Sequence, residues 1–98
     1  MANTAVKQKT TTSIKEPPMY KVIILNDDVT PMEFVILLLT TIFKHSESVA
    51  TELMLTIHTE NSAVVGIYNY EIAEQKTIDA TMLARDNGYP LLIKLETK

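Results

Sequence analysis

The sequence predicts an α+β fold, a small and open α/β sandwich with elements in the order β-α-α-β-α-β. Short apolar runs rich in β-branched residues alternate with segments whose apolar residues recur at helical spacing, and turn and cap residues separate them. Two helices between the first and second strands return the chain antiparallel, whereas one helix between the second and third leaves those two parallel. A sheet with the first strand in the middle satisfies both conditions, with the helices on one face.

The composition limits the classes of function. A chain of 98 residues with 46% hydrophobic residues forms one domain with one core. The net charge of -3 argues against a nucleic-acid binder, and the lack of cysteine excludes disulfides, thiol nucleophiles and cysteine-based zinc sites. The longest apolar run, residues 34–39, falls far short of the roughly 18 residues of a membrane span, and the N-terminus lacks the apolar stretch of a secretory signal.

The first part of the chain is predicted to be a tail. Residues 1–18 are polar and threonine-rich, so they bury too little apolar surface to offset their ordering entropy and are expected to be flexible. Pro17-Pro18 marks the boundary with a core domain at 19–98, and the apolar run at 20–25 predicts the first strand.

The first helix has a clear predicted start. Thr30 suits the N-cap, Pro31 the first helical position, and Glu33 completes a capping box. The helix is expected to run to about Lys44. Its core face is predicted to consist of Phe34, Val35, Leu38, Leu39 and Ile42.

Similar signals define the remaining elements. Ser46 is the predicted cap of a second helix that ends near Asn61, and a strand follows at 63–68. Asn69 is the predicted cap of a third helix, which Gly88 and Pro90 end before a last strand at 91–95. The apolar stripes are Ala50, Leu53, Met54 and Ile57 in the second helix and Ala73, Thr77, Ala80 and Ala84 in the third.

An amide and two acids, Asn26, Asp27 and Asp28, stand where the first strand meets the first helix. Turn chemistry explains them in part, because Asn and Asp side chains bond the backbone of tight turns and acids favour a helix N-terminus. A metal site or a hydrolase needs further ligands or a separate nucleophile and base, and no such constellation stands out. Another hypothesis is a pocket in which these acceptors hold an ammonium group beside an apolar groove.

The two histidines are interpreted differently. His45 lies in a polar junction between helices and is expected on the surface. His58 lies one turn after Met54 and next to Ile57, so it shares a helix face with apolar residues. Those apolar residues either pack in the core or line one wall of a groove.

Several stretches together resemble the ClpS family, adaptor proteins of the Clp AAA+ protease. They are "YKVIILNDDVTPMEFV", "ATELMLTIH", "VVGIY", "EIAEQK" and "GYPLLIKLE", within residues 17–96. The resemblance implies three helices on a three-stranded antiparallel sheet. It also implies an adaptor, without catalytic activity or cofactor, that binds substrates through a bulky hydrophobic N-terminal residue, an N-degron, and delivers them to an unfoldase.

The resemblance also implies roles for individual residues. Asn26, Asp27 and His58 are expected to bind the substrate α-amino group, while Asp28 and Thr30 position the substrate backbone. The hydrophobic pocket is expected to be lined by Met32, Val35, Met54, Ile57 and Leu91. Ile57 stands where many relatives carry valine, which reshapes the pocket. Glu71 and Lys76 are expected to dock on the unfoldase, and the tail at 1–18 to act in delivery.

The expected partners are N-degron substrates and the N-domain of a ClpA- or ClpC-type unfoldase, with no nucleic acid and no membrane. The protein is expected to be a monomer in the bacterial cytosol, with the plastid stroma as the less favoured compartment. Two alternatives stay open: a regulator that docks on the unfoldase without binding N-degrons, and a metal-dependent hydrolase that uses the paired acids.

Overall fold

The computed structural model describes residues 18–98, so the predicted tail, apart from Pro18, and its role in delivery lie outside the described residues. The strands are β2 (Met19–Leu25), β3 (Ser62–Asn69) and β4 (Leu92–Thr97). They form a sheet in the order β3-β2-β4, and β2 is antiparallel to both neighbours. The predicted topology, with the first strand in the middle, is confirmed.

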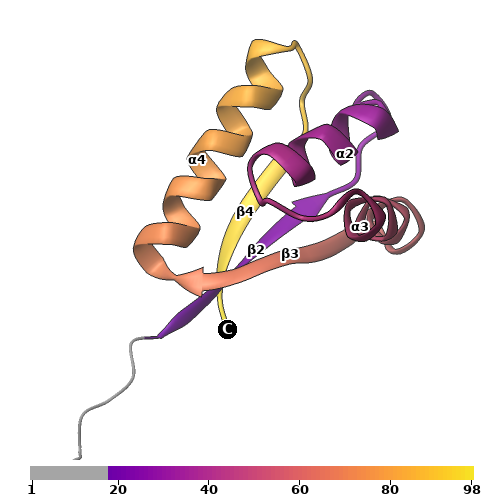
Figure 1. The fold of residues 1–98 in the computed structure, drawn as a ribbon. Coiled ribbons are helices and arrows are strands. Elements are labelled where there is room, and N and C mark those ends of the chain that lie inside the picture. The colour runs from indigo at the N-terminus through magenta and orange to yellow at the C-terminus, as the bar shows by residue number, and fades with distance from the viewer. Residues whose placement is uncertain (1–17) are drawn as a thin grey trace, which may run out of the picture.

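Three helices, α2 (Met32–Thr41), α3 (Glu47–Glu60) and α4 (Tyr70–Asp86), cover one face of the sheet (Figure 1). Val22 and Ile24 of β2 are fully buried beneath them, and Leu38 and Leu39 are the fully buried residues of α2. The helix α4 contributes only alanines to the core, namely Ala73, Ala80 and Ala84, all without exposed surface. Small side chains let this helix lie close to the sheet, so it contacts all three strands.

The start of α2 differs from the prediction. The N-cap is Pro31, with φ -66° and ψ 148°, and no side chain caps this end. The Pro31 carbonyl accepts a hydrogen bond from the backbone N–H of Phe34 at 3.1 Å. Thr30 does not cap the helix because its hydroxyl donates to Asp27 instead. The predicted capping box with Glu33 is therefore wrong, since its threonine bonds the turn before the helix.

The end of α2 is also earlier than predicted, at Thr41 rather than near Lys44. Lys44 adopts a positive φ of 62°, which the helix cannot accommodate. Beyond the last turn, the Lys76 ammonium of α4 donates to the Ile42 carbonyl at 2.8 Å and lies 5.7 Å from the centre of the Tyr68 ring. A cation at this position bonds an orphan carbonyl and interacts favourably with the helix dipole.

The polar junction between α2 and α3 is tied to the sheet. His45 is half-buried, and its Nε2 donates to the Val65 carbonyl of β3 at 2.6 Å. The expectation of a surface histidine is therefore wrong, because the ring bonds a strand that lies twenty residues further along the chain. This bond and the one from Lys76 fix the end of α2 against β3 and α4.

The other helix ends agree with the predictions. The Ser46 hydroxyl accepts from the Val49 N–H at 3.3 Å, and Asn69 Oδ1 accepts from the Ile72 N–H at 3.0 Å. Asn61 ends α3 in the left-handed conformation with φ 73°, and Gly88, at φ 80°, follows α4. Within residues 18–98, none of the helices is both long and apolar enough to span a bilayer.

Candidate functional site

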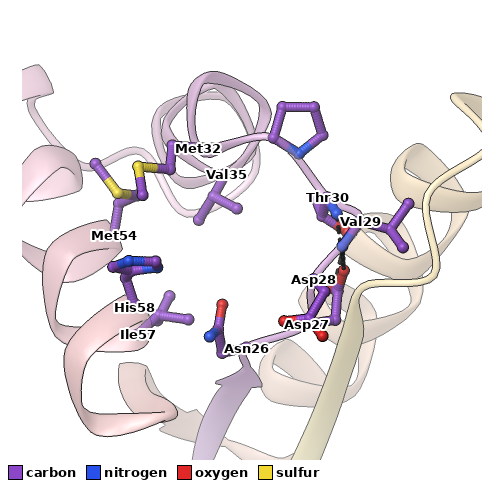
Figure 2. A pocket seen from close by; sticks show the side chains of 11 residues that line it. Asn26, Asp27, Asp28, Val29, Thr30, Met32, Val35, Met54, Ile57 and His58 are labelled. Atoms are coloured by element: carbon purple, nitrogen blue, oxygen red, sulfur yellow. Dashed lines mark hydrogen bonds between the residues drawn. The ribbon is translucent and has the colours of Figure 1, made fainter.

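A pocket of about 450 Å³ opens where β2 ends. Figure 2 shows its eleven lining side chains, which come from the loop after β2, the start of α2 and the second half of α3. They are Asn26, Asp27, Asp28, Val29, Thr30, Pro31, Met32, Val35, Met54, Ile57 and His58. Two segments separated by 18 residues in the sequence, 26–35 and 54–58, therefore build one site.

The polar edge of the pocket is anchored to the end of α3. The backbone N–H of Asn26 donates to the Asn61 carbonyl at 2.8 Å, directly beyond the last pair of the β2–β3 ladder, Leu25 with Ser62. Because Asn61 is the C-cap of α3, this bond fixes Asn26 relative to the last turn of that helix, where His58 lies. The side chains of Asn26 and His58 thus enter the same pocket from different elements (Figure 2).

Asp27 organises the loop. Its Oδ1 accepts hydrogen bonds from the backbone N–H groups of Val29 and Thr30, both at 2.7 Å. Its Oδ2 accepts from the Thr30 hydroxyl at 2.8 Å. Local bonds of this kind hold a tight turn in one conformation. The turn chemistry expected from the sequence is confirmed for this residue.

The same bonds set the charge of the Asp27 carboxyl. Partial burial alone would raise its pKa, but the hydrogen bonds from Thr30 and Val29, together with the positive charge of Arg85, outweigh burial and lower the pKa below the ordinary value of 3.8. The group is therefore ionised at neutral pH. A carboxylate accepts about four hydrogen bonds, so Oδ2 keeps room for one further donor. The exposed Asp28 beside it adds a second acid to the pocket.

The opposite wall is apolar and continuous with the core. Val35, Met54 and Ile57 are 5%, 7% and 2% exposed and pack in the hydrophobic core while also lining the pocket. Met32 is more accessible, with 43% of its surface exposed. The two alternatives for the apolar face of α3, core or groove wall, are thus both correct. The pocket offers acceptors on one side and apolar contact on the other.

Nine of the predicted site residues come together in this pocket: Asn26, Asp27, Asp28, Thr30, Met32, Val35, Met54, Ile57 and His58. Leu91, expected in the apolar wall, is not among the lining residues; its side chain is 1% exposed and packs in the core. Val29 and Pro31 also line the pocket, although neither was among the predicted site residues; both lie within the "YKVIILNDDVTPMEFV" stretch. Val29 points away from the other side chains in Figure 2.

Glu71 and Lys76 lie elsewhere. Both belong to α4, which contributes no residue to the pocket lining. Glu71 is exposed in the first turn, whereas the half-buried Lys76 is bonded to the end of α2. As Figure 1 shows, the first turn of α4 lies at the opposite end of the sheet from α2 and α3.

The acids do not assemble a metal-ligand cluster in the described part of the chain. Among residues 18–98, no group of three or more His, Cys, Asp or Glu side chains is placed to hold a metal ion. The Asp27 oxygens are bonded to the loop itself.

Comparison with known proteins agrees with the fold. Residues 15–94 match the sequence profile of the family described as ATP-dependent Clp protease adaptor protein ClpS. Relatives named ATP-dependent Clp protease adapter protein ClpS, from Shewanella pealeana and Shewanella piezotolerans, are 47% and 46% identical over 91 residues. Each match covers 93% of this chain and 89% of the relative.

A solved structure is also similar. The structure of Agrobacterium tumefaciens ClpS2 bound to L-phenylalaninamide matches with a TM-score of 0.82 and 42% sequence identity. The match covers 85% of this chain and 100% of that one.

The bonds of Asp27 predict a stability effect. Asp27→Ala removes all three accepted bonds, so it should lower the free energy of unfolding by about 1–3 kcal/mol. Asp27→Asn keeps one carbonyl oxygen for the two backbone donors and should lose less. Urea denaturation at pH 7 measures both, with Asp28→Ala, the exposed neighbour, as the control that stays within about 0.5 kcal/mol of the wild type. Equal losses for Asp27→Ala and Asp28→Ala would contradict this role.

The lowered pKa gives the same experiment a pH dependence. Because the folded pKa of Asp27 lies below the unfolded value of about 3.9, its contribution is fully present above that value and disappears as the pH falls through the folded pKa. The wild type should therefore lose more stability than Asp27→Asn between about pH 4 and pH 2. Parallel stability curves for the two proteins over this range would refute the assignment.

Proposed function

The chain belongs to the ClpS family of ATP-dependent Clp protease adaptor proteins, and from this premise we propose that it recognises N-degrons. It binds the first residue of a substrate protein when that residue is bulky and hydrophobic, and it delivers the substrate to a Clp AAA+ unfoldase. The observation that carries the proposal is the pocket itself, in which hydrogen-bond acceptors face an apolar wall within about 450 Å³.

The polar edge suits an α-ammonium group. Such a group has three donors and a positive charge, and the Asn26 oxygen, the free acceptor position of Asp27 and a ring nitrogen of His58 offer three acceptors. Only the first residue of a chain combines a free α-amine with a side chain on the same carbon. Asp28 and the Thr30 segment lie beside these acceptors, where the substrate backbone leaves the pocket.

The apolar wall supplies the selectivity for bulky residues. Burying a side chain of the size of Leu or Phe against Val35, Met54 and Ile57 contributes about 1.5–3 kcal/mol. A charge-assisted hydrogen bond to the amine contributes roughly as much. After the cost of association, these terms fit micromolar binding, which suits an adaptor that must release its substrate.

The similar Agrobacterium tumefaciens ClpS2 supports this assignment. Its ligand, L-phenylalaninamide, joins a free α-amine to an aromatic side chain, which are the two chemical features that the pocket described above accommodates. That ligand favours the adaptor over a regulator that docks without binding N-degrons. The adaptor description of the family, in turn, favours binding over hydrolysis.

We place the contact with the unfoldase N-domain, of the ClpA or ClpC type, on the first turn of α4. Glu71 is exposed there and distant from the pocket, so a substrate and an unfoldase can bind at once. Lys76 is less suited to test this surface, because replacing it also removes the bond to the Ile42 carbonyl. The protein is proposed to act as a monomer in the bacterial cytosol, in keeping with its bacterial relatives.

Peptide binding tests the proposed recognition. A peptide that starts with Phe should bind, as should its Leu, Tyr and Trp counterparts. The same peptide acetylated at the N-terminus lacks the charge, and one starting with Ser lacks the apolar side chain, so each should bind at least about tenfold more weakly. Fluorescence anisotropy measures the affinities of the free Phe, acetylated Phe and Ser peptides. Equal affinity for the free and acetylated Phe peptides would exclude amine recognition.

A charge reversal tests the docking surface. Glu71→Lys should weaken binding to the unfoldase N-domain by about tenfold or more while leaving the affinity for a Phe peptide unchanged. Asp86→Lys, the same charge change at the other end of α4, is the matched control and should bind normally. If both variants lost the unfoldase equally in a pull-down, the contact would not be at the first turn of α4.

A further inference from the structure

We propose that Met32 is a site of reversible oxidation and that its sulfoxide prevents the pocket from holding a bulky hydrophobic residue. The proposal rests on the proposed function, because it concerns the same pocket. The observation that supports it is a pair of methionines in the pocket lining, Met32 from α2 and Met54 from α3. Figure 2 shows the Met32 side chain pointing toward Met54 at one edge of the pocket.

The composition of the chain and the exposed surface of its methionines make Met32 the pocket residue most accessible to an oxidant. The chain has five methionines and no cysteine, so no thiol of its own competes for peroxide. Of the two pocket methionines, Met32 is 43% exposed and Met54 only 7% exposed. Reagents in solution therefore reach the Met32 sulfur first. Met82 on α4 is 57% exposed and outside the pocket, which makes it an internal control.

The chemistry is a single oxygen transfer. A sulfur lone pair of Met32 attacks one oxygen of hydrogen peroxide, and the O–O bond breaks as the S–O bond forms. The other oxygen leaves as hydroxide, which takes up the proton of the attacked oxygen and becomes water. Sulfur is oxidised by two electrons and the peroxide is reduced by two. Methionine sulfoxide reductases restore the thioether, so the change is reversible.

The sulfoxide conflicts with both halves of the pocket. Its oxygen is a strong acceptor, and covering it with an apolar substrate side chain without a donor costs free energy. The Thr30 hydroxyl already donates to Asp27, so the side-chain donors left in the lining are the Asn26 amide and the His58 ring. A sulfoxide that accepts from either group holds that side chain out of the position in which its acceptor atom faces the α-amine. Each arrangement therefore weakens the binding of an N-degron.

The experiment measures the affinity for a Phe-initiated peptide before and after treatment with hydrogen peroxide, with peptide mass spectrometry reporting the oxidation of each methionine. The wild type should lose about tenfold or more in affinity as Met32 is oxidised and should recover it after treatment with the reductases. Met32→Leu, compared with its own untreated sample, should keep its affinity. Met82→Leu should lose affinity as the wild type does.

Each other outcome overturns the proposal. Unchanged affinity of the wild type with Met32 oxidised shows that the sulfoxide is tolerated. An equal loss in Met32→Leu assigns the effect to another methionine, and a loss that coincides with unfolding by circular dichroism assigns it to the core. If the untreated wild type does not bind the Phe peptide at all, the proposed function fails and this proposal fails with it, whereas binding that survives oxidation overturns this proposal alone.

Discussion

The carboxylate of Asp27 holds the loop on which the rest of the site depends. By accepting from the backbone of Val29 and Thr30 and from the Thr30 hydroxyl, it fixes the turn between β2 and α2. These bonds use Thr30, which leaves Pro31 to start α2 without a side-chain cap. They also lower the pKa of Asp27, so the residue that shapes the loop carries a negative charge into the pocket. Loop geometry and the electrostatics of binding thus have a common origin.

The apolar half of the pocket depends on the core in a similar way. Val35, Met54 and Ile57 pack in the core and also form the pocket wall, so the wall is as rigid as the core itself. A rigid wall loses little entropy when a ligand binds to it. Because the same residues serve the core and the wall, substitutions in the wall are expected to change stability as well as selectivity. The first turn of α4, distant from the pocket, is free of this constraint.

Local signals in the sequence predict the helices and strands, whereas contacts between distant segments account for several differences between the predicted and the observed structure. Ser46 and Asn69 cap their helices as predicted because each bonds a backbone group three residues away. Thr30 failed as a cap because two local patterns competed for one hydroxyl. The bonds of His45 to β3 and of Lys76 to the end of α2 join segments that no spacing rule connects. For the site, proximity of Asn26 to His58 followed from the resemblance, while the burial of Leu91 required the packed structure.

The most direct test of the proposed N-degron pocket is the position at which a minimal ligand binds. L-Phenylalaninamide, added to protein with labelled methyl groups, should give intermolecular nuclear Overhauser effects from its ring to the methyls of Met32, Met54 and Ile57, which line the pocket. The Met82 methyl on α4 should give none. Effects at Met82, or no effect at the pocket methyls when the protein is saturated with ligand, would contradict the account.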